Sequence, residues 1–470
     1  MALSNRRFPM KHQGQTTSDQ ISTRIGDTIG DMSSSGDTAA TFCATLVDEW
    51  ARQGIRHAVV APGSRSTPLA LALALNNDIE VHVFHDERSA SFAALGIGSA
   101  SGVPAVLLCS SGTAGTHFHG AVVEAHQSDV PMIVCTADRP PELRDVAAAQ
   151  TIDQTHLFGS AVRWFHDPGV PSREAAMSWR SLASRAVQAA VGIHPGPVHL
   201  NLPFREPLTG DVVDMPPPRE KKWSDVIHLG TSETQNLSEI VHAISGRRGV
   251  IIAGRGASRE VLSLSESLGW PVFADAVSGV RERNSAVIIG FDAILRSEKF
   301  ASSHIPEVVL RIGAPPASKV LAQWVSRVDC PVIQVRSSSM VIDPDHKVQN
   351  TVVGDVETTI RALASQATAC DKSWLSSWSQ AETAAQDAIS VWTAQNFSEP
   401  SIARTVSSAM TVGSHLVVSS SMPIRDVEWF GTATSGVTVH SNRGTNGIDG
   451  VISTAIGVGL VTKARVTLLI

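Results

Sequence analysis

The sequence predicts an α/β protein built from three doubly wound parallel-sheet domains. Two observations support this prediction. Short strands and helices alternate along the chain from residue 38 onward. The strands are continuous apolar runs, such as residues 57–61, rather than runs that alternate between apolar and polar side chains. Continuous runs are typical of parallel strands that helices cover on both faces.

The first domain is predicted over residues 38–213. It follows a polar stretch, residues 1–37, that is too poor in apolar side chains to form a core and is predicted to be a disordered extension. Gly54 ends the first helix and Pro62 the first strand. The predicted helices are 41–53, 68–75, 89–100 and one after residue 115, and the predicted strands are 57–61, 80–84, 104–109, 131–136 and 195–203.

A stretch rich in proline and charge predicts a linker over residues 214–236. The central α/β domain is predicted over 237–370, with strands 249–253, 271–274, 307–312 and 331–335 and a turn at 343–346. A third α/β domain over 371–470, which the resemblance described below implies to be the diphosphate-binding domain, is predicted with helices 371–396, 401–410 and 450–461 and strands 415–419, 437–440 and 465–470. Because the chain ends within a strand, we expect this third domain to be incomplete.

Composition excludes several classes of protein. The net charge of -6 argues against a nucleic-acid partner. No apolar run reaches the ~18 residues that a membrane span needs, and the N-terminal stretch lacks the apolar core of a signal peptide. None of the five cysteines forms a C-x-x-C pair, which favours free thiols in a reducing compartment. We therefore expect a cytoplasmic protein without a membrane span.

Ligands of open α/β sheets bind where loops leave the carboxyl ends of strands. Four such loops have hydroxyl, acidic or guanidinium groups at a helix start, although each is also compatible with an ordinary capped turn. They are residues 61–68 (APGSRSTP), 85–88 (HDER), 110–115 (SSGTAG) and 136–142 (TADRPPE). Two further polar clusters, 419–426 and 441–450, come late in the chain. Several arginines on such loops suggest substrates with more than one carboxylate.

Taken in order, these motifs resemble the family of 2-succinyl-5-enolpyruvyl-6-hydroxy-3-cyclohexene-1-carboxylate (SEPHCHC) synthases of menaquinone biosynthesis. The matching strings are 61–69 (APGSRSTPL), 86–88 (DER), 111–114 (SGTA), 136–143 (TADRPPEL), 441–444 (SNRG) and 447–450 (GIDG). The resemblance implies a thiamine-diphosphate enzyme with pyrimidine, central and diphosphate domains. It also implies an active site shared between two subunits, and hence a homodimer or homotetramer.

The implied reaction is a carbon–carbon bond-forming transfer. 2-Oxoglutarate is decarboxylated on thiamine diphosphate, with Mg²⁺ (or Mn²⁺), and the resulting succinyl carbanion adds to isochorismate. The resemblance assigns Glu87 as the carboxylate that activates the cofactor's pyrimidine, and Gly112 and Thr113 as further cofactor-binding residues. The residues that it assigns to the substrates are Ser64, Arg65, Arg139, Gln150, Lys319, Ser421, Arg425 and Arg443.

One departure from the family pattern concerns the metal. The Gly-Asp motif that the resemblance places directly after the strand 465–470 is missing, so the expected metal ligands lie beyond Ile470 and none is predicted in the chain. Two alternatives remain. One is another thiamine-diphosphate enzyme, a 2-oxoacid decarboxylase or an acetolactate-synthase-like enzyme, although these lack the arginine set. The other is an inactive truncated fragment.

Overall fold

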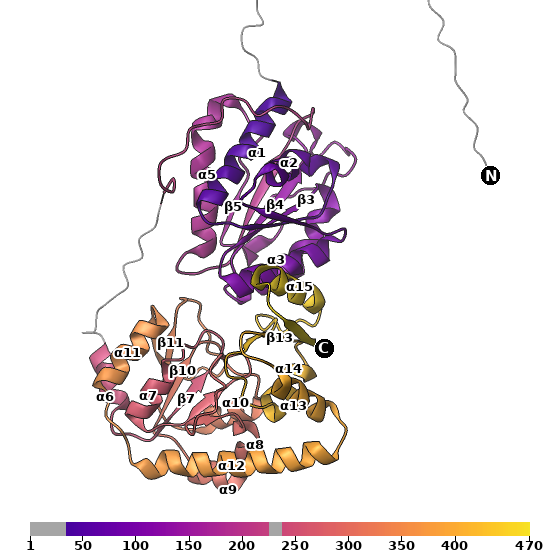
Figure 1. The fold of residues 1–470 in the computed structure, drawn as a ribbon. Coiled ribbons are helices and arrows are strands. Elements are labelled where there is room, and N and C mark those ends of the chain that lie inside the picture. Colours follow the sequence, from indigo (N-terminus) through magenta and orange to yellow (C-terminus); the bar gives the residue numbers. More distant parts are fainter. Residues whose placement is uncertain (1–33, 225–236) are drawn as a thin grey trace, which may run out of the picture.

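The computed structural model describes residues 34–224 and 237–470 and contains three α/β domains, each built on a sheet whose strand pairings are all parallel (Figure 1). Among the described residues the three sheets have six, six and three strands. The predicted fold class is therefore confirmed. Most of the predicted extension, 1–33, and most of the predicted linker, 225–236, lie outside the described residues.

The first domain contains the elements of residues 35–203. Its strands are β1 (His57–Val60), β2 (Glu80–Val83), β3 (Ala105–Cys109), β4 (Met132–Asp138), β5 (Trp164–His166) and β6 (Pro197–Pro203). Its α-helices are α1 (Ser35–Arg52), α2 (Thr67–Leu75), α3 (Glu87–Ser101), α4 (His119–Gln127) and α5 (Ala176–Val191). Its 3-10 helices are η1 (Ser64–Ser66), η2 (Gly112–Phe118), η3 (Pro141–Leu143), η4 (Gly159–Ala161) and η5 (Arg173–Ala175).

The strand order of the first sheet is β2-β1-β3-β4-β6-β5. The chain therefore moves from β1 outward to β2 and then returns to the other side of β1 with β3. Helices α1, α2 and α5 bury apolar side chains against one face of this sheet, and α3 and α4 against the other. In doubly wound sheets, the crevice outside the carboxyl ends of strands at such a reversal is the usual place for a ligand.

Helix α1 begins six residues before the position predicted from the sequence. Its start is a capping box: the Ser34 hydroxyl accepts a hydrogen bond from the Asp37 amide, and the Asp37 carboxylate accepts one from the Ser34 amide, each at 3.0 Å. Residues 35–37, assigned to the extension from the sequence, are thus helical. Strand β5 is not predicted by the sequence, because its three half-buried residues give too short an apolar run to recognise.

The central domain has its own apolar core and a sheet of order β12-β11-β10-β7-β8-β9. Its strands are β7 (Gly249–Ala253), β8 (Val272–Ala274), β9 (Val287–Ile288), β10 (Val308–Ile312), β11 (Val332–Arg336) and β12 (Val348–Val353). Its helices are α6 (Ser238–Ile244), α7 (Val261–Leu268), α8 (Phe291–Leu295), α9 (Glu298–Ser303), α10 (Lys319–Arg327) and α11 (Val356–Gln366). Strands β9 and β12 are not predicted by the sequence; β9 has two residues, and β12 is partly exposed.

Helix α12 (Lys372–Gln395) connects the central domain to the third. The sequence places residues 371–396 in the third domain, but Trp374 and Trp378 lie in the central core. The Trp378 ring packs edge-on against Phe273, with ring centres 5.0 Å apart. The first half of α12 therefore belongs to the central core, because burying two indole rings there removes a large apolar area from water.

The third domain contains α13 (Glu399–Ala409), β13 (His415–Val418), α14 (Met422–Phe430), β14 (Thr438–His440), α15 (Val451–Thr462) and β15 (Val466–Leu469), with strand order β14-β13-β15. Helix α14 is not predicted by the sequence.

Helix α15 packs closely on α3 of the first domain (Figure 1). A Cβ atom on Gly96 would lie 2.1 Å from the Thr454 carbonyl oxygen, and one on Gly457 would lie 2.0 Å from the Ala93 carbonyl oxygen. Glycine at both positions is what lets the two helices approach so closely.

Candidate active site

The loops after β1 and β3 meet at the reversal of strand order in the first sheet. A Cβ atom on Gly63 would lie 2.4 Å from the Cβ of Ser110, so the two loops can approach this closely only with glycine at that position. The Ser66 hydroxyl donates to the Gly63 carbonyl at 2.8 Å and fixes the first turn of the loop. Ser64, predicted to bind substrate, is exposed on this turn.

Two guanidinium groups lie at the same edge of the sheet. Arg65 is buried and donates to the Phe204 carbonyl at 2.9 Å and to the Glu206 carboxylate at 3.1 Å. Arg139 is half-buried and donates to the Ser111 hydroxyl. Burial lowers the pKa of Arg139, and the positive charge of Arg65 lowers it further. The two side chains therefore concentrate positive charge at a partly buried position, which suits an anionic ligand.

Gln150 borders this crevice from the segment after β4. Its Nε2 atom donates to the Ser111 carbonyl at 3.2 Å, and its φ of 57° lies in the left-handed region, which is uncommon for a residue with a side chain. A Cβ atom on Gly112, whose φ is 80°, would lie 3.0 Å from the Gln150 Cγ. Gly112 and Gln150 therefore pack against each other, and Thr113 is exposed beside them.

A buried polar network under the crevice was missed by the sequence analysis. Gln154 accepts a hydrogen bond from the Gly112 amide at 2.8 Å and donates to the Asn201 side chain at 2.8 Å. Asn201 in turn donates to the Asp138 carboxylate at 2.9 Å, and Arg144 forms an ion pair with Asp138 at 2.9 Å. Burial raises the pKa of Asp138. This network fixes the Gly112 backbone and the end of β4. The one feature of the sequence that could have indicated the network is Asn201, a polar residue inside an apolar strand.

Glu87 is the first residue of α3, directly after the loop that follows β2. Asp86 caps this helix by accepting a hydrogen bond from the Ser89 amide at 2.8 Å. The Glu87 side chain is half-buried, and a carboxylate in the first turn of a helix is stabilised by the helix dipole. Burial raises the pKa of the Cys109 thiol at the end of β3, and the charge of Glu87 raises it further. Glu87 therefore lies near the strand end that leads to Ser111 and Gly112.

Lys319 and Arg425 form a second group, away from the first crevice. Both line a cavity of about 430 Å³ together with Arg296 and Trp429. All its lining residues within the described part of the chain belong to the central and third domains. Ser421 precedes α14, the helix of Arg425, and is exposed with a φ of 71°.

Arg443 lies in the loop that precedes α15. Glu124 on α4 of the first domain accepts hydrogen bonds from the Gly444 amide at 2.6 Å and from the Thr445 amide at 2.7 Å. Burial lowers the pKa of Arg255 in the central domain, and the charge of Arg443 contributes to this shift, so Arg443 lies near Arg255. The structure thus places Arg443 where the three domains meet.

Within one chain, the predicted site residues therefore fall into three groups. The first group lies at the carboxyl edge of the first sheet and comprises Ser64, Arg65, Glu87, Gly112, Thr113, Arg139 and Gln150. The second comprises Lys319 and Arg425, with Ser421 at the start of the same helix as Arg425. Arg443 is alone in the third.

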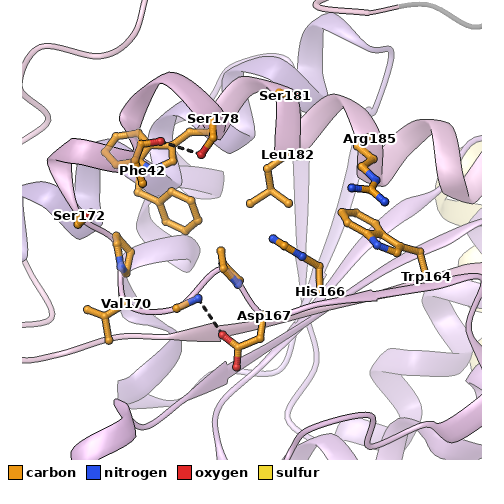
Figure 2. Close-up of a pocket in the computed structure, with 15 residues that line it drawn as sticks. Phe42, Trp164, His166, Asp167, Val170, Ser172, Ser178, Ser181, Leu182 and Arg185 are labelled. Carbon is orange, nitrogen blue, oxygen red and sulfur yellow. Dashed lines mark hydrogen bonds between the residues drawn. The ribbon is translucent and has the colours of Figure 1, made fainter.

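A further cavity, of about 350 Å³, lies between α1, α5 and the segment after β5 (Figure 2). Its wall includes Trp164 stacked on His166, with ring centres 5.1 Å apart, and Arg185 over the Trp164 ring at 4.5 Å. None of the predicted site residues lines this cavity among the described residues. The predicted site residues and this cavity therefore lie in different parts of the first, central and third domains.

Two protein-family models match the chain. The model described as the thiamine pyrophosphate enzyme N-terminal TPP binding domain matches residues 40–157, and the model described as the middle domain of thiamine pyrophosphate matches residues 218–418. The first range contains every predicted residue of the first group, and the second contains Lys319. Ser421, Arg425 and Arg443 lie beyond both ranges.

Curated relatives match most of the chain. The 2-succinyl-5-enolpyruvyl-6-hydroxy-3-cyclohexene-1-carboxylate synthase of Thermobifida fusca is 42% identical over 440 residues, which cover 91% of this chain and 77% of the relative. Proteins of the same name from Bacillus pumilus and Geobacillus kaustophilus are 38% and 37% identical over 448 residues, which cover 92% of this chain and 77% and 78% of the relatives. The chain belongs to this synthase family.

Membership in the SEPHCHC synthase family makes the chain an enzyme, a thiamine-diphosphate-dependent transferase. The range of the N-terminal family model, a TPP-binding domain, includes Arg65, Glu87 and Arg139. Within residues 34–224 and 237–470, no helix combines the length and the apolar character needed to cross a membrane.

Proposed function

We propose that this SEPHCHC synthase decarboxylates 2-oxoglutarate with thiamine diphosphate and adds the remaining four-carbon unit to isochorismate, a step of menaquinone biosynthesis. The relatives' name describes a cyclohexene carboxylate that bears a succinyl and an enolpyruvyl group, which is the product expected from these two substrates. The observation that most supports the proposal is the meeting of the polar loops at the switch point of the first sheet. It places a half-buried carboxylate, Glu87, at the strand end next to the one that holds Arg65.

Glu87 is assigned to the pyrimidine of the cofactor. Thiamine diphosphate, when bound, supplies the electron sink for the decarboxylation. The Glu87 carboxylate would hold a proton at a ring nitrogen of the pyrimidine, and its partial burial strengthens that hydrogen bond relative to water. Gly112 is assigned to the cofactor with Glu87, and its missing side chain and positive φ let Gln150 pack directly against its backbone.

Arg139 is the better placed of the two first-domain arginines to bind a substrate carboxylate. The two terminal nitrogens of Arg65 are already bonded to Phe204 and Glu206. Arg139 is half-buried, and within residues 34–224 and 237–470 its guanidinium donates to the neutral Ser111 hydroxyl and forms no salt bridge with a carboxylate. A guanidinium without an acidic partner can form the two parallel hydrogen bonds that a carboxylate accepts. Ser64 and Gln150 would add a hydroxyl and an amide at the same crevice.

The second group of residues is assigned to the same reaction in a homodimer or homotetramer. Lys319 and Arg425 line a cavity built by the central and third domains. The family resemblance implies a site shared between subunits, in which the first domain of a second copy, with its Glu87 and Arg139, would lie against this cavity. Ser421 and Arg443 would then contribute from the third domain. A closed two-fold arrangement of this kind is common in homo-oligomers.

A mixing experiment tests the shared site. Glu87→Gln and Arg425→Ala chains, each inactive alone, are unfolded, mixed and refolded together. If each site uses Glu87 of one chain and Arg425 of the other, random pairing gives a heterodimer with one intact site, and about one quarter of the wild-type activity returns. A mixture that stays inactive while wild-type protein recovers by the same procedure argues for a site within one chain.

Magnesium (or manganese) is the proposed companion of the cofactor, because the diphosphate needs a hard divalent cation to neutralise its charge. A cytoplasmic location is also proposed. It is supported by the five free cysteines, four of which are buried, since free thiols persist in a reducing compartment.

The decisive assay uses the protein purified from its own gene, with thiamine diphosphate and Mg²⁺. Carbon dioxide release and consumption of isochorismate are followed with 2-oxoglutarate and, separately, with pyruvate. We expect turnover that needs both 2-oxoglutarate and isochorismate. Turnover of pyruvate alone would favour a 2-oxoacid decarboxylase or an acetolactate-synthase-like enzyme, and an absence of turnover with either 2-oxoacid would overturn the proposal.

A further inference from the structure

Three side chains that can bind a metal ion lie together on β1 and β2. In the parallel pairing of these strands, His57 is the register partner of Glu80, and His82 follows two residues later on β2. Residues two apart on a strand point to the same face, so all three side chains share the face that α3 covers. One ligand atom from each lies within 4.8 Å of the other two. His57 and Glu80 begin their strands, so this cluster lies at the opposite edge of the sheet from Arg65 and Arg139.

The two imidazole rings have the spacing that a tetrahedral metal ion requires. The Nδ1 atom of His57 and the Nε2 atom of His82 are 3.2 Å apart. Zinc–nitrogen bonds of about 2.0–2.1 Å place two ligand atoms of a tetrahedron about 3.3 Å apart. Glu80 is exposed and would supply a charged oxygen ligand while leaving a fourth position open to water.

A second histidine pair provides a comparison within the same chain. His415 and His440, on β13 and β14 of the third sheet, have the same diagonal relation, a nitrogen–nitrogen distance of 3.0 Å and the same interplanar angle of 21°. The register partner of His415 is Thr438, where the first pair has Glu80. A hydrogen bond between the rings therefore accounts for the second pair. The carboxylate is what distinguishes the first.

We propose that His57, Glu80 and His82 bind a divalent transition-metal ion of the zinc type. Two imidazoles and a carboxylate suit Zn²⁺ and related ions better than Mg²⁺, which prefers oxygen ligands alone. Glu80 is paired with Lys463, at the end of α15, at 3.8 Å. The exposed partners make this a weak ion pair that a metal ion can displace.

The position indicates a structural role for the ion. β2 is the edge strand of the first sheet, and a metal ion held by both β1 and β2 would join this edge strand to its neighbour. Because Lys463 follows the helix that packs on α3 (Figure 1), release of Lys463 on metal binding would also weaken one contact between the first and third domains.

The test is a zinc titration of the full chain. The protein is treated with a chelator, supplied with excess Mg²⁺ so that oxygen-ligand sites are filled, and titrated with Zn²⁺ in a calorimeter. We expect one Zn²⁺ per chain. His82→Ala and Glu80→Gln should each weaken binding by at least ~10-fold, since loss of even an outer partner of a metal site costs that much. Lys463→Met, which removes the competing ammonium group, should strengthen binding by up to about fivefold.

The matched control is His415→Ala, which removes one ring of the other histidine pair and should leave the zinc affinity unchanged. No saturable Zn²⁺ binding by the wild-type chain would overturn the proposal. Equal zinc affinities of the wild type and Glu80→Gln would also overturn it. Glu80 is exposed, so its replacement should keep the fold even if His82→Ala does not. Loss of zinc binding in His415→Ala alone would place the site at the other pair and would equally contradict the assignment.

Discussion

Glu124 and Thr445 are joined by two hydrogen bonds of 2.7 Å, which the Thr445 amide and hydroxyl both donate to the same carboxylate oxygen. The Gly444 amide donates a third, at 2.6 Å, to the other oxygen. Glu124 is buried on α4 of the first domain, and Thr445 lies 321 residues later in the loop of Arg443. One buried carboxylate therefore holds this loop against the first domain.

Replacing Glu124 by alanine should destabilise the contact between the first and third domains. The substitution removes the acceptor of two backbone amides and of the Thr445 and Ser128 hydroxyls in a contact that is partly buried, and a buried donor left unsatisfied costs about 1–3 kcal/mol. We expect the free energy of unfolding to fall by about 3 kcal/mol, measured as a lower urea midpoint, and the loop at 441–450 to become sensitive to protease.

Thr445→Val is the matched control for Glu124→Ala, because it removes the hydroxyl donor and keeps both amides. It should cost about 1 kcal/mol. Equal urea midpoints for wild type and Glu124→Ala would show that the carboxylate does not hold the loop.

Glu87→Gln should abolish turnover and leave the fold intact. Glutamine has nearly the same shape, but it cannot carry the negative charge that polarises the pyrimidine, and loss of an acid–base group typically costs ~10²–10⁴-fold in rate. Steady-state kinetics should show a loss in kcat of this size or larger, with an unchanged circular dichroism spectrum. Asp86→Asn is the control, because asparagine can still accept the hydrogen bond of the Ser89 amide that caps α3. A wild-type kcat in Glu87→Gln would contradict the role assigned to Glu87.

Arg139→Lys should lower kcat/KM for 2-oxoglutarate by about 10-fold or more. Lysine keeps the charge, but it cannot make the paired hydrogen bonds of a planar guanidinium, and a hydrogen bond to a charged group contributes about 1.5–3 kcal/mol. Arg205→Lys is the control, because Arg205 is a nearby exposed arginine whose guanidinium donates two hydrogen bonds to Glu142. A similar loss of kcat/KM in both variants would mean that the loss does not come from a carboxylate contact made by Arg139 in particular.

The four loops of the first group were predicted from the strand-end rule of parallel sheets, whereas their individual residues, and Gln150, were assigned through the family resemblance. Strands of a parallel sheet end at the same edge, so the loops after the predicted strand ends at residues 61, 84, 109 and 136 were expected to meet there. The glycines and hydroxyls of these loops marked tight turns at helix starts. Arg65, Glu87, Gly112 and Arg139 could thus be placed together from the amino-acid sequence alone.

Contacts between distant segments could not be predicted in this way. Glu124 is one acidic residue among several on a short helix, and its partners at 444–445 depend on how two domains dock. Gln154 and Asn201 lie 47 residues apart and meet only through tertiary packing. The cluster of His57, Glu80 and His82 depends on the register of β1 against β2, and a shift of one residue would move the side chains of one strand to the other face.

Acid should weaken the first domain through His199. This histidine is buried on β6, and its Nε2 atom shares a hydrogen bond of 2.8 Å with the Thr136 hydroxyl. Burial lowers its pKa from the usual 6.5 to about 3. Above pH 6.5 the ring is neutral in both the folded and the unfolded chain, so the full stability is present. As the pH falls from 6.5 toward 3, the unfolded chain binds a proton that the folded chain does not, and stability is lost.

From pH 7 to pH 5 this one group should reduce the free energy of unfolding by about 2 kcal/mol. His199→Gln cannot take up the proton, so its urea midpoint should change less between the two pH values than that of wild type, whatever its absolute stability. His117→Gln, at an exposed position, should keep the wild-type pH dependence. If His199→Gln and wild type lose the same stability between pH 7 and pH 5, then His199 is not kept neutral in the folded chain, and another group causes the acid sensitivity.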